Sequence, residues 1–475
     1  MTGFQDYESY DALGLADLIR RGEVSAPEVL DAAIERVDAR NPALNAVVHK
    51  MHDTARASID AGLPAGPLSG VPYMLKDLYV LYTGAPTTNG SRLFADFVAD
   101  HDSTLTERLR AAGLVIMGKT NSPEFGYNFF TEPVLHGPSR NPWNTEHSPG
   151  GSSGGAAAAV AAGMLPAAHA TDGGGSIRIP AANCGLFGLK PTRARNPSGP
   201  DVGEGWSGMG VGHAVTRSVR DSAALLDATH GPAPGDPYCA PPPARPFSEE
   251  IGADPGRLRI GLITAAPGGH DVDPVCVAGA EATAKLCEDL GHHVEPAGID
   301  VDIAAVNEAV KVIIGGNMRL VIDARCAALG REPREDDVER ATWHLAEEAR
   351  GFSAADYARA IQALHATGRR MTGFFASYDL LLSPTLANPP LPLGTVDMMA
   401  APEGYFDALF RRLPFTPLFN VTGQPACSLP LHWTDDGLPV GVQFGADFGN
   451  EALLLRMASQ IEQARPWFDR RPPPL

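Results

Sequence analysis

The chain has 475 residues, of which 44% are hydrophobic and 20% charged, a balance typical of a globular protein with a large core. Its formal net charge of −18, with no Lys/Arg-rich run, argues against nucleic acid as a partner. No apolar run approaches the roughly 20 residues that a membrane-spanning helix needs, and the N-terminal segment lacks the regions of a signal peptide. The six cysteines are scattered, as expected for reduced thiols. We therefore expect a cytoplasmic protein without membrane or nucleic-acid partners.

Helical spacing of apolar residues predicts two N-terminal helices, over residues 9–22 and 26–40, that pack as a lid. Ser25 is the candidate N-cap of the second helix, and Pro27 lies in its first turn. The apolar run GVPYMLKD then ends in Lys76 and Asp77. Lys76 is either a strand-end side chain that reaches solvent or a buried base, and these residues alone leave both open.

A phosphate-loop pattern, GLVIMGKT, occupies residues 113–120 after a predicted helix over 103–112. A phosphate-binding loop must follow a strand and keep its backbone free. Here the predicted strand, 114–117, lies inside the pattern. We therefore reject ATP or GTP binding.

The most informative stretch, residues 147–180, reads HSPGGSSGGAAAAVAAGMLPAAHATDGGGSIRIP. Two glycine- and serine-rich loops flank a predicted helix of small residues, 156–162. Glycines allow successive backbone amides to converge on an anion, and a hydroxyl beside such a nest can be a nucleophile with its oxyanion hole. A flexible linker is the alternative, but the alanine run and the apolar 177–180 disfavour it.

Like the phosphate-loop pattern, a second short motif matches only by chance. It is GxSxG around Ser152, the pattern of a hydrolase nucleophile elbow. That elbow follows an apolar strand, whereas 141–149 is polar and proline-rich, so Ser152 is not expected to be an elbow nucleophile. His147 and His169 lie nearby as candidate bases. No spacing rule supports either histidine, and we interpret both as loop or packing residues.

Downstream, helices are predicted over 216–230, 273–290 and most of 303–350, and strands over 258–263, 380–385, 425–431 and 438–444. Trp206 lies in a Gly-rich segment that could line the mouth of a pocket. His292 and His293 open a further strand, where neighbours point to opposite faces, so no shared metal site is expected. Alternating strands and helices predict an α/β fold.

The chain resembles the amidase signature family of Ser–cis-Ser–Lys hydrolases along almost its full length. The resemblance is carried by GVPYMLKD (70–77), GLVIMGKTNSPEFG (113–126), SRNPWN (139–144), SPGGSSGG (148–155), TDGGGSIRIPAANCGLFGLKPT (171–192) and LFNVTGQPACSLP (418–430). It implies one large α/β domain, 1–475, with a central mixed sheet covered by helices on both faces. We expect four parts: a helical segment (1–65), a catalytic core (66–230), a variable region (231–400) and a C-terminal part that completes the sheet (401–475).

Carried over by position, the resemblance implies Lys76 as general base, Ser152 as the bridging serine in a cis peptide, and Ser176 as nucleophile. It implies an oxyanion hole formed at Gly173, Gly174, Gly175 and the Ser176 amide. It also implies that Ser153 and Asp172 support the loops. Gly173 departs from many relatives, which carry a larger residue, and could loosen the nest. No metal or cofactor is expected.

The implied activity is hydrolysis of carbon–nitrogen bonds in linear or cyclic amides, with carbamates and esters as further candidates. Thr131-Glu132-Pro133 and the ending Pro466-Trp467-Phe468 resemble the branch that hydrolyses nylon-oligomer cyclic amides and related amides and carbamates. Tyr127, Trp206 and Met209 are candidate pocket residues. The alternatives are an aliphatic or aryl acylamidase, a glutaminase of the tRNA-dependent amidotransferase type that works with a partner, and a binding protein that kept the fold. The sequence leaves open whether the protein forms a homodimer.

Overall fold

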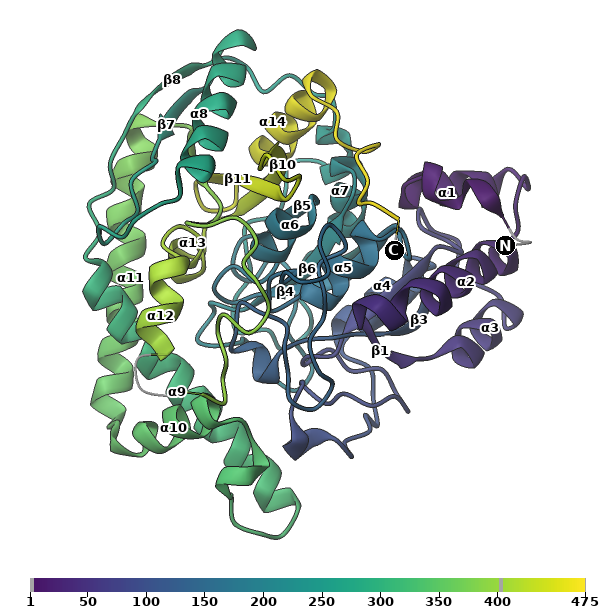
Figure 1. The fold of residues 1–475 in the computed structure, drawn as a ribbon, viewed down its shortest axis with the longest axis horizontal. Coiled ribbons are helices and arrows are strands. Elements are labelled where there is room, and N and C mark those ends of the chain that lie inside the picture. Colours follow the sequence, from purple (N-terminus) through teal and green to yellow (C-terminus); the bar gives the residue numbers. More distant parts are fainter. Residues whose placement is uncertain (1–3, 401–404, 475) are drawn as a thin grey trace.

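The computed structural model describes residues 4–400 and 405–474 (Figure 1). The expected part boundary at 400/401 adjoins residues 401–404, which lie outside the described residues. The strands are β1 (Val47–Lys50), β2 (Pro72–Lys76), β3 (Val115–Thr120), β4 (Ala167–Asp172), β5 (Phe187–Lys190), β6 (Val211–Thr216), β7 (Arg259–Leu262), β8 (His293–Pro296), β9 (Leu380–Pro384), β10 (Ala426–Trp433) and β11 (Pro439–Ala446). The α-helices are α1 (Ala12–Arg20), α2 (Ala26–Leu44), α3 (His52–Asp60), α4 (Thr104–Ala111), α5 (Gly154–Ala161), α6 (Arg178–Cys184), α7 (Val219–Thr229), α8 (Pro274–Asp289), α9 (Ile303–Ala328), α10 (Arg340–Glu348), α11 (Ala354–Ser377), α12 (Tyr405–Arg412), α13 (Pro417–Thr422) and α14 (Glu451–Ala464).

Within the described residues, eight strands form the main sheet in the order β4-β6-β5-β10-β11-β9-β7-β8. Neighbours from β4 to β9 pair antiparallel, whereas β7 pairs parallel with both β9 and β8, so the sheet is mixed. Its centre is the predicted C-terminal hairpin, β10 and β11, which lies between β5 and β9. Segments from both halves of the chain therefore meet at the middle of the sheet.

The two faces of β11 show why helices cover both sides of the sheet. Val442 and Phe444 belong to the buried cluster that contains residues of α8 and α14. The alternate residues face α6 and α13: Gly441 adjoins Ala182 of α6, and Gly445 adjoins the ring of Phe419 in α13. Glycine at these two positions lets α6 and α13 approach closely, since an added Cβ at Gly445 would lie 2.0 Å from Phe419. Gln443, also on this second side, accepts a hydrogen bond from Arg178 at the start of α6.

A smaller sheet, β1-β3-β2, lies beside β4 and was not anticipated from the sequence. Helix α5 packs beside it and is buried throughout. Its small residues allow backbone to lie against backbone: a Cβ on Gly155 would lie 2.4 Å from the Asn121 nitrogen and 2.6 Å from the Ala46 oxygen. The low bulk of this helix therefore sets the distance between the small sheet and the loop before α5.

The N-terminal helices pack on this same region, at the right of Figure 1. Ser25 caps α2 as predicted, and Glu28 completes a capping box with it. The C-terminal tail returns to the N-terminal segment, where the Arg471 guanidinium donates to the Glu8 carbonyl at 2.7 Å. At the opposite side, α9, α10 and α11 share a buried cluster with residues 125–130 and Met209.

Most of the predicted elements are confirmed, including the strand inside GLVIMGKT, which is β3. The structure adds strands that we did not predict: β1, β4, β5 and β6. Strand β4 reads AAHATD, and alanine favours helices over strands, so its neighbours in the sheet decide its conformation. Among the described residues, no helix is both long and apolar enough to cross a membrane.

We predict that Gly155→Ala lowers the free energy of unfolding by about 1–3 kcal/mol, because the methyl group collides with two backbone segments. The matched control is Gly373→Ala in α11, where a Cβ has no neighbour within 4 Å. Helix propensity alone would favour both substitutions by about 1 kcal/mol. Urea denaturation of the two variants measures the difference, and equal stabilisation of both would contradict the close packing of α5.

Candidate active site

Three segments bring Lys76, Ser152 and Ser176 to one region of the molecule. Lys76 ends β2 and is fully buried, and its Nζ lies 2.6 Å from Ser152 Oγ and 2.8 Å from Thr171 Oγ1. Ser152 follows a cis peptide bond with Gly151 and is 2% exposed. Ser176 lies in the loop between β4 and α6 and lines a cavity. Solvent exposure thus increases from Lys76 to Ser152 to Ser176.

Burial controls the charge of Lys76. It lowers the pKa of Lys76 well below that of an ordinary lysine, and the negative charge of Asp172 opposes this shift only in part. The backbone N–H of Lys76 donates to His169 Nδ1 at 3.3 Å. Burial also lowers the pKa of His169 to about 3, so this histidine is a neutral acceptor behind the lysine. His169 is a packing residue, as we interpreted it, and His147 lies in a turn bridged to Pro392.

Two other lysines are fully buried in the described chain, and neither reaches a serine. Lys119 of the GLVIMGKT motif donates to the Val80 carbonyl at 2.8 Å and to Thr87 Oγ1. Lys190 donates to the Pro191 carbonyl at 2.7 Å, and burial lowers its pKa to about 7. Geometry, rather than burial alone, therefore distinguishes Lys76. The position of Lys119 agrees with the rejection of nucleotide binding.

The loop before Ser176 is held by Asp172. Its carboxylate accepts from the Gly175 N–H at 2.7 Å and the Ile177 N–H at 3.2 Å. The Arg178 guanidinium lies 2.9 and 3.0 Å from the same carboxylate. Burial disfavours the charged form of Asp172, but Arg178 outweighs it, and the pKa of Asp172 falls to about 2. Asp172 thus has the supporting position that the resemblance implied.

One expectation for the glycine nest needs correction. Gly173 and Gly174 line the cavity beside Ser176, but the Gly175 N–H is directed at Asp172. Gly175 has φ +130, and a Cβ there would lie 2.4 Å from Thr416 Oγ1. Its amide therefore anchors the loop and does not face the cavity. Sequence spacing could not separate these roles, because adjacent glycines look alike.

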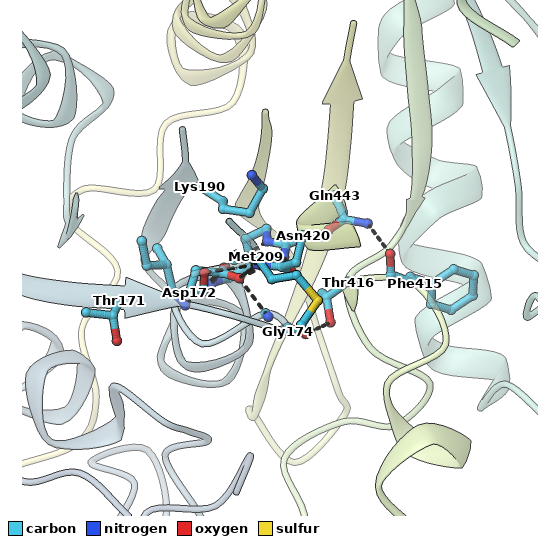
Figure 2. Close-up of polar contacts among 12 residues, drawn as sticks. Thr171, Asp172, Gly174, Lys190, Met209, Phe415, Thr416, Asn420 and Gln443 are labelled. Atoms are coloured by element: carbon cyan, nitrogen blue, oxygen red, sulfur yellow. Dashed lines mark hydrogen bonds and ion pairs between the residues drawn. The ribbon is translucent and has the colours of Figure 1, made fainter. Parts of the chain in front are cut away.

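Further residues that the sequence analysis did not single out complete this support (Figure 2). The Asn420 side-chain amide donates to the Asp172 carbonyl at 2.9 Å, and Thr416 Oγ1 donates to the Gly174 carbonyl at 2.8 Å. Arg178 donates to Gln443 Oε1 and to Asn420 Oδ1, both at 2.7 Å. Arg178 and Asn420 lie in motifs that carried the resemblance. The two hydrogen bonds from Arg178 to Gln443 and to Asn420 each join residues more than 240 positions apart in sequence.

Ser153 and Thr171 join the two loops. Ser153 Oγ donates to the Thr171 carbonyl and accepts from the Thr171 N–H, both at 3.2 Å. Thr171 also contacts Lys76 Nζ through its hydroxyl. Ser153 therefore links the loop of Ser152 to the strand that leads to Ser176. Thr171 was missed because it precedes Asp172 as an ordinary strand residue.

The cavity beside Ser176 is open to solvent, and in the described chain none of its lining residues is charged. Tyr127, Trp206 and Met209, the predicted pocket residues, all line it. Its other walls come from α9, α12, α13 and nearby segments, at positions Gly126, Asn128, Phe129, Ile179, Val310, Ile314, Leu409, Phe410, Leu413, Pro417 and Val421. The cavity therefore suits an uncharged, largely apolar group. Over the described residues, no cluster of three His, Cys, Asp or Glu side chains is arranged to hold a metal ion.

Comparison with known proteins decides the family. The family model described as Amidase matches residues 28–455. This chain belongs to the amidase family. It is 40% identical to the 6-aminohexanoate-cyclic-dimer hydrolase of Paenarthrobacter ureafaciens, over 97% of this chain and 96% of the relative. It is 38% identical to the putative amidase AmiC of Mycobacterium tuberculosis, over 96% and 95% of the two chains.

Solved structures agree with this assignment. A structure of 6-aminohexanoate cyclic dimer hydrolase superposes on the amidase with a TM-score of 0.92, at 40% identity over 98% of this chain and 99% of the other. A bacterial aryl acylamidase of the amidase signature family gives a TM-score of 0.88, at 29% identity over 98% and 99% of the two chains. The protein is an amidohydrolase that cleaves carbon–nitrogen bonds, and the expected α/β domain with its mixed sheet is confirmed.

We predict that Asp172→Asn lowers the free energy of unfolding by about 3 kcal/mol, because it leaves the buried Arg178 charge without its partner. An amide group also presents a donor where the carboxylate accepts from backbone amides. The control is Asp436→Asn in the exposed β10–β11 turn, where Asn-Gly and Asp-Gly are both favoured. Chemical denaturation of both variants tests the prediction. An Asp172→Asn enzyme as stable as the control would contradict it.

Proposed function

We propose that the amidase hydrolyses small uncharged amides through an acyl-enzyme on Ser176, with Lys76 as base and Ser152 as proton relay. The observation that carries the proposal is the 2.6 Å contact between Lys76 Nζ and Ser152 Oγ. Ser176 lines an apolar cavity together with Gly126, and a Cβ on Gly126 would lie 3.2 Å from Ser152 Oγ. A buried lysine with a lowered pKa can be neutral at moderate pH and accept a proton.

In the proposed reaction, Ser176 Oγ attacks the amide carbonyl carbon as its proton passes to Ser152 and the Ser152 proton passes to Lys76. The developing oxyanion accepts hydrogen bonds from the amides of Gly173, Gly174 and Ser176. The C–N bond breaks as the leaving nitrogen receives the relayed proton. Water then attacks the acyl-enzyme carbonyl as its proton passes through Ser152 to Lys76. The acyl C–O bond breaks as the relay returns the proton to Ser176 Oγ, which releases the acid and restores the enzyme.

The proposed substrate class follows from the cavity and the relatives. The relatives are named for their action on 6-aminohexanoate cyclic dimer, which is a ring with two amide bonds and no free amine or carboxylate. A lining without charged side chains favours such a substrate over ionic ones, because an unpaired charge loses its hydration there. We therefore propose cyclic and linear uncharged amides, with carbamates and esters as further substrates.

A second candidate is aryl acylamidase activity, which the aromatic side chains of Tyr127 and Trp206 and the similarity to an aryl acylamidase support. A glutaminase role of the amidotransferase type, with a partner, is less favoured, since glutamine carries two charges. The cytoplasmic location, the homodimer and the four-part division of the chain stay predictions.

We predict that Ser176→Ala lowers kcat by at least about 10³-fold while the protein stays folded, because the acyl acceptor is lost. Lys76→Ala and Ser152→Ala should be severely impaired, and the double variant little worse than either, since the residues act as a unit. Lys119→Met, which changes another buried lysine, tests whether any such loss is specific. Steady-state kinetics with circular dichroism measures this, and a Ser176→Ala enzyme near wild-type activity would exclude the assignment.

The pH dependence follows from Lys76. Only deprotonated Lys76 accepts a proton, so kcat/KM should fall as pH drops through its pKa, which lies well below 10.5. Asp172 raises this pKa, so Asp172→Asn should move the acidic limb to lower pH. Profiles of kcat/KM for the two enzymes measure the shift. An unchanged or higher limb in Asp172→Asn would argue against Lys76 as the base, and inhibition by EDTA that zinc reverses would indicate a metal-dependent mechanism instead.

The substrate class is tested with a panel of cyclic lactam dimers, aliphatic amides, acyl anilides, carbamates and glutamine. The uncharged substrates should be hydrolysed with higher kcat/KM than glutamine, because the cavity offers no partner for a charge. Ser176→Ala is the blank for every substrate. Activity on glutamine alone would contradict the proposed substrate class and leave the Ser–Ser–Lys mechanism intact.

A further inference from the structure

Gly173 and Trp206 compete for one volume beside the nucleophile. A Cβ added to Gly173 would lie 2.8 Å from Trp206 Cζ3 and 2.9 Å from Cε3, closer than such atoms approach in proteins. The space that a larger residue at 173 would take is therefore filled by the indole ring. The glycine that the sequence suggested would loosen the nest is covered by Trp206 instead. At the neighbouring Gly174, an added Cβ has no atom within 4 Å.

The backbone of Trp206 is held in an unusual conformation. Trp206 and Ser207 have φ values of +50 and +51, a left-handed region that costs non-glycine residues about 1 kcal/mol or more each. The surrounding loop is closed by a bridge between Gly205 and Gly210. Arg193 Nε also donates to the Gly208 carbonyl at 2.8 Å. Such a conformation persists only where neighbouring contacts determine it.

The same loop is fastened to the distant helices. Ser207 Oγ lies 2.8 Å from the hydroxyl of Tyr357 in α11. That hydroxyl accepts a hydrogen bond from Asn317 Nδ2 of α9, also at 2.8 Å. On the other side, Asn420 of α13 donates to the Met209 carbonyl at 3.1 Å. The loop that carries Trp206 is thus held by residues of α9, α11 and α13.

We propose that Trp206 is a specificity-determining residue, a fixed wall that limits the size of the substrate group next to the reacting carbonyl. The inference rests on the proposed function, since it takes Ser176 as the nucleophile of this cavity. Trp206, Gly173 and Ser176 line the cavity together with residues of α9, and the indole lies against Gly173. Gly173 admits the ring, and Ser207 with Tyr357 keeps it in place.

The first test is the substrate-size profile. Two series of amides are used, one with the acyl group lengthened and branched stepwise, the other with the amine group varied in the same way. In Trp206→Ala and Trp206→Leu, the ratio of kcat/KM for large over small members should rise about 10-fold or more in one series. The control is Trp343→Ala, which shortens a tryptophan of the same buried cluster that does not line the cavity. An unchanged ratio in the folded Trp206 variants, or an equal rise in Trp343→Ala, overturns the proposal.

The second test is a double-mutant cycle between the two residues that share the volume. Gly173→Ala alone should lower both Tm and kcat/KM, because the methyl group and the indole cannot both fit. In the Trp206→Ala background the same substitution should lower Tm much less. Gly174→Ala is the control for Tm, since its methyl group meets no protein atom. Additive effects of Gly173→Ala and Trp206→Ala would show that the two side chains do not exclude one another and would overturn the inference.

The two proposals fail in distinguishable ways. Activity that persists in Ser176→Ala removes the proposed function and with it the assignment of this cavity. Activity that depends on Ser176 but keeps its size profile in every Trp206 variant removes only the specificity role of Trp206.

Discussion

A buried ion pair, Asp172 with Arg178, joins the parts of the chain on which the site depends. Asp172 ends β4 and gathers backbone amides of the serine loop, whereas Arg178 begins α6 and reaches Gln443 of β11 and Asn420 of α13. Both charges are fully buried, so each is tolerated only because the other satisfies it. The pair therefore couples the geometry of the serine loop to the centre of the main sheet.

The charges around the site are arranged in layers. Lys76 lies in a buried setting that favours its neutral form, and the cavity in front of Ser176 has no charged lining among the described residues. The ionised groups Asp172 and Arg178 lie behind the loop, away from the cavity. If Lys76 is the base, as proposed, a neutral lysine and backbone donors suit a reaction in which charge appears only transiently, on the attacked carbonyl oxygen.

The proposed catalytic residues and most of the cavity wall come from different regions of the chain. Lys76 ends β2 of the small sheet, and Ser152 and Ser176 lie in the loops before α5 and after β4. Much of the cavity wall comes instead from α9, α12 and α13. The Trp206 loop connects the two, because it touches the glycine nest on one side and hydrogen-bonds to α11 on the other. Substitutions in the distant helices can therefore reshape the cavity without touching the lysine and the serines.

The sequence by itself determined the α/β class, most helices and the hairpin at 425–444, because periodicity and turn residues act locally. The motifs shared with the amidase signature family also implied the roles of Lys76, Ser152 and Ser176. Only the tertiary structure decided that Lys76 rather than Lys119 meets a serine, because both end apolar strands and differ only in what packs against them. It alone separated Gly175, directed at Asp172, from Gly173, covered by Trp206. These roles depend on contacts between segments far apart in the chain, and no local pattern of residues encodes such contacts.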